Sequence, residues 1–162
     1  MNLTRSVFIV PFSILVLSCM TNGCAGKIFK DKPPSVVIQV TASSDLNPDI
    51  QERPSPIVLR IYTLKSDDIF KNAGFFALYE QDANILGGDL ISREELEISP
   101  GEIRTLEKRE LPMGPHFIGV LAAYRDLDNA VWRGTIATPA DKTTNISITL
   151  EKLTLTVTSG KK

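Results

Sequence analysis

Histidine and cysteine, which carry much enzymatic and metal chemistry, are scarce in this chain of 162 residues. His116 is the only histidine and follows a Gly-Pro turn, so we expect it to be buried or at a strand edge, because a histidine metal site needs further ligands. Glu94 and Glu95 are adjacent, and adjacent residues of a strand point to opposite faces. Asp126-Leu127-Asp128-Asn129 lacks the later glycine and glutamate of a calcium loop, and reads as a hairpin turn. The sequence predicts neither an enzyme nor a metal or organic cofactor.

The two cysteines, Cys19 and Cys24, carry the one covalent modification that the sequence predicts. An apolar run over 7–17 is too short to span a bilayer but is typical of the hydrophobic part of a secretory signal. The run leads into Val16-Leu17-Ser18-Cys19, which resembles the lipobox, where a bacterial signal peptidase cleaves and the cysteine thiol is lipidated. Cys19 is therefore the predicted lipidation site, with Cys24 as the alternative.

The covalent lipid is the only membrane anchor that we expect, because no later apolar run is long enough to cross a bilayer. Met20 follows Cys19 where lipoproteins retained in the inner membrane commonly carry aspartate, which favours the periplasmic face of the outer membrane. A net charge of −1 gives no reason to expect a nucleic-acid partner. We expect a signal peptide over 1–18, a lipidated tether over 19–34 and one folded domain over 35–162.

Most of the domain alternates apolar and polar residues, which is typical of β-strands. The predicted strand regions are 36–41, 57–62, 89–98, 102–111, 116–126, 130–138 and 144–159. In the last region the apolar residues change from even to odd positions near Glu151-Lys152, which predicts a bulge or a crossing between sheets. We expect an all-β fold: an antiparallel β-sandwich of about seven or eight strands.

One segment, 66–81, has helical spacing of its apolar residues instead. Ser66 is a candidate cap at its start, and two acidic residues follow in the first turn. Asn72 and Gly74 are expected to divide it into two short helices. Since no strand–helix repeat accompanies it, the segment is a helical insertion in a β-sandwich and not part of a parallel α/β sheet.

The segment 44–56, SDLNPDIQERPSP, is a long polar connection between the first two predicted strands. Long loops in compact domains are commonly functional. Its prolines Pro48, Pro54 and Pro56 restrict the unbound backbone, so less entropy is lost when a partner binds. Leu46 and Ile50 are candidate apolar anchors for such a partner. A merely solvated connection is the alternative.

The sequence resembles the TssJ family, the outer-membrane lipoproteins of the type VI secretion system. The motifs that carry the resemblance are DLNPD at 45–49, RPSPIVLRIYTLK at 53–65, GFFALYE at 74–80, LGGDL at 86–90, SPG at 99–101, IGVLAAYRD at 118–126 and WR at 132–133. The family often has glycine before the Arg-Pro-Ser-Pro motif, where this chain has Glu52. The lipobox is also atypical, which leaves the choice between the two cysteines open.

The resemblance implies a transthyretin-like sandwich tethered to the inner leaflet of the outer membrane. It also implies that the loop between the first two strands binds the periplasmic C-terminal region of TssM, and through TssM connects indirectly to TssL. The expected partner-binding residues are Leu46, Asn47, Pro48, Asp49, Ile50, Gln51, Glu52, Arg53 and Pro54.

Two other functions are compatible with a sandwich of this kind. A periplasmic ligand-binding or inhibitor lipoprotein would have a deep apolar cavity between the sheets. A hydrolase like the transthyretin-fold hydroxyisourate hydrolases would need several histidines, whereas this chain has only His116.

Overall fold

The computed structural model describes residues 32–160, which belong to one compact unit, Asp31–Lys162. The predicted signal peptide, both candidate lipidation sites (Cys19 and Cys24) and the tether up to residue 31 lie outside the described residues. No helix within 32–160 has the length and apolar character that a membrane crossing requires.

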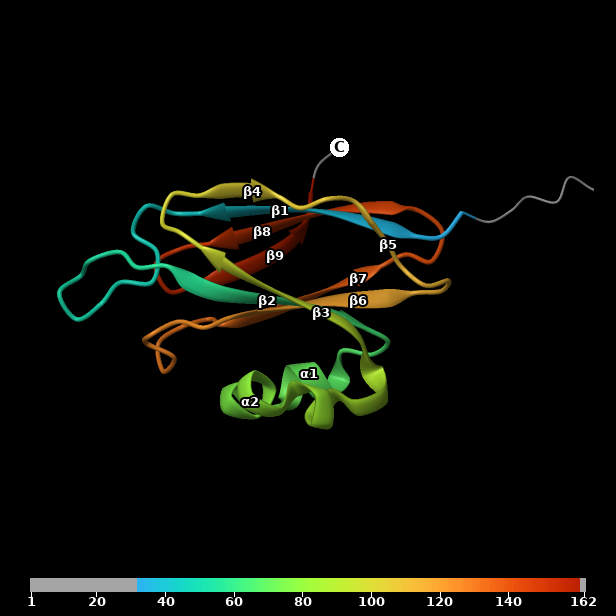
Figure 1. Ribbon diagram of the computed structural model, residues 1–162, viewed down its shortest axis with the longest axis horizontal. Coiled ribbons are helices and arrows are strands. Elements are labelled where there is room, and N and C mark those ends of the chain that lie inside the picture. Colours follow the sequence, from blue (N-terminus) through green and yellow to red (C-terminus); the bar gives the residue numbers. More distant parts are fainter. Residues whose placement is uncertain (1–31, 161–162) are drawn as a thin grey trace, which may run out of the picture. The chain divides into compact units, whose positions relative to one another are not determined.

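The described residues form a sandwich of two sheets, as predicted (Figure 1). One sheet has the order β4-β1-β8-β9, with β5 also paired to β1; the other has the order β3-β2-β6-β7. The strands of the first sheet are β1 (Ser35–Ala42), β4 (Ile103–Thr105), β5 (Arg109–Glu110), β8 (Thr143–Leu150) and β9 (Leu155–Ser159). Those of the second are β2 (Ile57–Leu64), β3 (Leu90–Ile98), β6 (His116–Ala122) and β7 (Arg133–Thr138).

Three details differ from the expected sandwich. The region 102–111 forms two short strands, β4 and β5, which both pair with β1 and bring the described strands to nine. Strands β1 and β8 run parallel, from Ser35 opposite Thr143 to Ala42 opposite Leu150, so the sandwich is not purely antiparallel. The parity change near Glu151-Lys152 marks neither a bulge nor a crossing, because β8 and β9 are antiparallel neighbours joined by a turn that the Glu151 N–H closes on the Thr154 carbonyl.

Strand β2 is nearly all buried because both faces of its sheet are covered. Ile57, Leu59 and Ile61 face the other sheet and belong to the core between the sheets. Tyr62 and Leu64, which point the other way, pack in a second apolar cluster beneath the helices. Figure 1 shows the helices on the face of this sheet that is turned away from the first sheet.

The helical insertion divides as predicted. Helix α1 (Asp68–Asn72) and helix α2 (Phe75–Leu86) are separated by Ala73 and Gly74, both in extended conformation, and η1 (Gly87–Asp89) follows. Helix α2 extends to Leu86, past the predicted end at 81. Gly119 on β6 permits close packing of helix α1 on the sheet, since a Cβ at this position would lie 3.2 Å from the Phe70 ring.

Ion pairs also fasten the helices to the sheet. The buried carboxylate of Asp82 accepts hydrogen bonds from Arg93 (2.7 Å) and from the Tyr62 hydroxyl (3.2 Å). Arg60 on β2, which is paired with Glu95 of β3 at 2.6 Å, lies over the Tyr79 ring of α2, 4.1 Å from its centroid. The insertion is therefore held on this face by both apolar and charged contacts.

Candidate partner-binding loop

The connection from β1 to β2 covers residues 43–56 and projects from one end of the sandwich, at the left of Figure 1. It passes from one sheet to the other, but it is far longer than this requires, because the β3–β4 and β7–β8 connections make the same passage with four residues each. Strand β1 starts at the opposite end, where the chain enters the domain from the tether. Eight residues of extended strand separate the two ends by about 25 Å.

The base of the loop is anchored in the domain by two residues that we expected to contact a partner. Leu46 is fully buried and belongs to the core between the sheets. Asn47 is also buried, and its φ of 47° is in the left-handed region that asparagine tolerates better than most residues. The prediction that Leu46 and Asn47 offer surface to a partner is therefore wrong, because their side chains are used within the domain itself.

Asn47 links the loop to two other connections of the fold. Its side-chain amide donates to the Pro56 carbonyl (2.9 Å), and its side-chain oxygen accepts from the Arg125 N–H (2.9 Å), which follows β6. Its backbone N–H donates to the Lys152 carbonyl (3.1 Å), in the turn between β8 and β9. One side chain and one peptide group thus fix the positions of three loops relative to one another.

The outer part of the loop is organised around Asp49. Its carboxylate accepts hydrogen bonds from the backbone N–H groups of Gln51 (2.8 Å) and Arg53 (3.0 Å), and from Arg53 Nε (2.7 Å). The Asp49 backbone N–H also donates to the Arg53 carbonyl (2.9 Å). The Arg53 guanidinium and these N–H groups lower the pKa of Asp49 to about 2. The tip is thus a closed turn with its own hydrogen bonds.

This turn leaves the predicted contact residues of its tip exposed. Ile50 is 95% exposed, the most exposed large apolar side chain of the described domain. Gln51, Glu52, Arg53 and Pro54 are also exposed, and Pro48 is half-buried. Of the nine residues expected from the sequence, the surface is therefore formed by those from Pro48 to Pro54.

Glu52 occupies the position where the resemblance leads us to expect glycine. Its φ is 59°, a left-handed conformation that glycine adopts without cost and that most other residues avoid. The Glu52 carboxylate pairs with Lys152 Nζ at 2.6 Å, and this contact raises the pKa of Lys152. The departure from glycine thus leaves the turn in place and adds a link to the β8–β9 turn.

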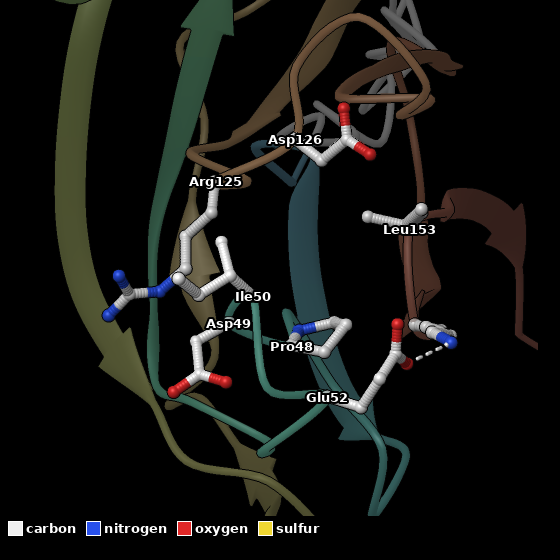
Figure 2. A pocket seen from close by; sticks show the side chains of 8 residues that line it. Pro48, Asp49, Ile50, Glu52, Arg125, Asp126 and Leu153 are labelled. Carbon is white, nitrogen blue, oxygen red and sulfur yellow. Dashed lines mark hydrogen bonds and ion pairs between the residues drawn. The ribbon is translucent and has the colours of Figure 1, made fainter.

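An open hollow of about 690 Å³ lies between the loop, the β6–β7 connection and the β8–β9 turn (Figure 2). It is lined by Pro48, Asp49, Ile50, Glu52, Arg125, Asp126, Lys152 and Leu153. The sequence did not identify Arg125, Lys152 or Leu153 as part of the site. The only signals were the turn predicted at 126–129 and the parity change near 151–152, neither of which says that these turns lie beside the loop.

The remaining candidates for chemistry occupy positions within the sheets. His116 is buried on β6, as expected. Glu94 pairs with Arg109 at 2.6 Å, whereas Glu95 pairs with Arg60, so the two adjacent carboxylates do point to different partners. The space between the sheets is filled by core side chains, and the hollow beside the loop is lined by residues of the connections. A packed interior with a projecting loop favours a scaffold over a ligand-binding module.

Comparison with known proteins agrees with this architecture. Residues 34–153 match the family model described as "Type VI secretion lipoprotein, VasD, EvfM, TssJ, VC_A0113". No curated protein matches the chain.

Three solved structures have the same fold. The T6SS lipoprotein TssJ1 from Pseudomonas aeruginosa has 36% sequence identity and a TM-score of 0.75, over 81% of this chain and 99% of the other. A chain in a structure of the T6SS protein TssM C-terminal domain from EAEC has 27% identity and a TM-score of 0.64, over 76% and 99% of the two chains. A chain in a structure of a type VI membrane complex has 26% identity and a TM-score of 0.66, over 78% and 99%. The chain therefore belongs to the TssJ family of type VI secretion lipoproteins.

Proposed function

We propose that this lipoprotein binds the periplasmic C-terminal region of TssM through the exposed tip of the β1–β2 loop, residues 48–54. By this contact it anchors the TssJ–TssL–TssM membrane complex to the outer membrane, with TssL connected indirectly through TssM. Membership of the family and the likeness to chains in structures of a TssM domain and of a type VI membrane complex support this partner.

The observation that carries the proposal is the loop itself. Its base is buried and hydrogen-bonded, while its tip presents an almost fully exposed isoleucine on a turn closed by Asp49. An ordered tip loses little entropy on binding and gains the burial of its apolar residue, Ile50. An interaction surface needs these properties, and the exposed side chain of Ile50 has no evident use in the fold.

The position of the chain entry fits an anchoring role. The tether joins the domain at the start of β1, and the loop lies at the far end of that strand, about 25 Å away. In chain order, a lipid on Cys19, or on Cys24, would precede β1, whereas the loop follows this strand. Three acyl chains, at about 0.8 kcal/mol for each buried methylene, make such an anchor effectively permanent.

The binding test uses the full-length lipoprotein in detergent and the purified periplasmic region of TssM from the same bacterium. We expect Ile50→Asp to remove most of the binding, because it places a charge in the apolar centre of the contact. Met113 is a matched control, since it is also apolar and exposed (59%) but lies in the connection before β6, at the other end of the sandwich. Equal binding by Ile50→Asp and Met113→Asp would rule out the loop as the contact.

The anchor has a separate test. Cells that express the chain are labelled with a radioactive fatty acid, and Cys19→Ser is compared with Cys24→Ser. We expect the label to be lost from Cys19→Ser and retained by Cys24→Ser; the opposite result would move the lipid to Cys24.

A further inference from the structure

Of the charged side chains around the hollow beside the loop, all but that of Arg125 have a partner within the part of the domain that the structure describes. Asp49 pairs with Arg53 (2.6 Å), Glu52 pairs with Lys152 (2.6 Å), and the Asp126 carboxylate accepts from the Asn129 amide (3.0 Å). The exposed guanidinium of Arg125 has no ion pair or hydrogen bond with any residue of 32–160. Figure 2 shows the Arg125 and Asp126 side chains directed to different sides.

Although its side chain is unpaired, the Arg125 backbone is firmly held. Its N–H donates to the buried Asn47 side chain (2.9 Å), so the residue is fixed relative to the loop. The preceding Tyr124 is buried, and its hydroxyl donates to the Glu151 carbonyl (3.1 Å). The same burial raises the pKa of Tyr124, which therefore stays a neutral donor. Because the backbone is fixed, only the Arg125 side chain has to be ordered when it receives an anionic group.

Apolar surface lies beside this cation. Ile50 at the loop tip lines the same hollow as Arg125, together with Pro48 and Leu153. An exposed guanidinium next to an apolar wall matches a segment of protein that carries a carboxylate beside an apolar side chain. The two carboxylates of the loop tip, Asp49 and Glu52, are already paired with cations of the domain and so do not repel such a segment strongly, and the third carboxylate of the hollow, Asp126, is directed to another side than Arg125 (Figure 2).

We propose that Arg125 is a specificity-determining residue of the binding surface, which pairs with a carboxylate of the partner while the hollow beside it takes a neighbouring apolar side chain. This inference rests on the proposed binding of TssM by the loop and assigns the chemistry of the contact. The contact surface then extends from the loop tip to the β6–β7 connection, and the partner segment is acidic as well as apolar.

The experiment measures association and dissociation of the periplasmic region of TssM on the full-length lipoprotein, at low and at high salt. The lipoprotein is inserted in vesicles of phosphatidylethanolamine and phosphatidylglycerol. Charge pairs at the edge of an interface act mainly on the association rate and its salt dependence. We expect Arg125→Glu to lower the affinity about 100-fold and Arg125→Ala about 10-fold, with Arg125→Lys between wild type and alanine. The decrease of the association rate with salt should become smaller in Arg125→Glu and Arg125→Ala.

Lys142→Glu is the matched control, because Lys142 is exposed at the opposite end of the sandwich and the substitution changes the net charge equally. Binding by Arg125→Glu and Arg125→Ala equal to that of Lys142→Glu, together with loss of binding by Ile50→Asp, would overturn the role of Arg125 and leave the proposed function standing. Weaker binding with an unchanged salt dependence would also overturn it. Wild-type binding by Ile50→Asp would refute the proposed function instead.

Discussion

Asn47 offers the sharpest test of how the loop is held. The substitution Asn47→Ala removes the donor to the Pro56 carbonyl and the acceptor of the Arg125 N–H, and it places alanine at a φ of 47°. Each buried hydrogen bond is worth about 1 kcal/mol net, and the left-handed conformation costs alanine about 1 kcal/mol more than asparagine or glycine, which adopt it more readily. We therefore expect Asn47→Ala to lower the free energy of unfolding by about 3 kcal/mol.

Two further variants separate these contributions. Asn47→Gly keeps the backbone conformation and loses both hydrogen bonds, so the loss should be about 2 kcal/mol. Asn47→Asp keeps the acceptor for the Arg125 N–H but directs a carboxylate at the Pro56 carbonyl, and should also lose about 2 kcal/mol.

The assay is urea unfolding followed by circular dichroism, on the chain from Asp31 onwards. Asn129→Ala is the control, since the amide of that residue is exposed and bonds only to Asp126 among the described residues; a loss below about 1 kcal/mol is expected. If Asn47→Ala were as stable as Asn129→Ala, the account of the loop base would be wrong. Equal stability of the alanine and glycine variants at position 47 would refute the argument from φ alone.

Three more results are expected. Glu52→Gly should be more stable than Glu52→Ala by about 1 kcal/mol in urea unfolding, because both lose the exposed pair with Lys152 and only alanine is strained at a φ of 59°; the reverse order would contradict this. The pKa of Asp49, measured by NMR, should be about 2. Its contribution to stability is therefore complete above its ordinary pKa of 3.8 and disappears as the pH falls through about 2. Arg53→Ala should raise this pKa, and an unchanged pKa would show that the pair does not form. Leu46→Ala should cost 2–5 kcal/mol, about as much as other leucine truncations in cores, and a loss below about 1 kcal/mol would place Leu46 outside the core.

The features that could be predicted from the sequence depend on neighbours in the chain. The helical insertion and its division near Gly74 follow from local spacing, because a helix is made of contacts between residues three and four apart. The loop is predicted by its prolines and polar residues, which lie between two alternating segments. The turn at the tip of the loop also depends on near neighbours, since Asp49 closes it by accepting from residues two and four positions later.

What could not be predicted depends on distant partners. Asn47 is buried because its side chain reaches the Arg125 N–H, a residue 78 positions away, and no local pattern distinguishes it from the exposed polar residues that follow. The sequence predicts Leu46 as an anchor for a partner, because nothing nearby indicates that its side chain points into the core. The parallel pairing of β1 with β8 joins the two ends of the domain and has no signature in either strand.

The parity change at 151–152 was interpreted wrongly for a similar reason. A turn and a bulge both interrupt the alternation of apolar residues, and only the pairing of Leu150 with Leu155 shows that the chain reverses there. This turn matters for the site, because Lys152 and Leu153 line the hollow beside the loop.

The central claim, that the loop tip touches TssM in the cell, has one direct measurement. A photoreactive amino acid replaces Ile50 in the full-length lipoprotein, and in a second strain it replaces Met113; both strains are irradiated while type VI secretion is active. We predict a covalent adduct of the lipoprotein with TssM from position 50 and none from position 113. An adduct from position 113 with none from position 50 would contradict the claim.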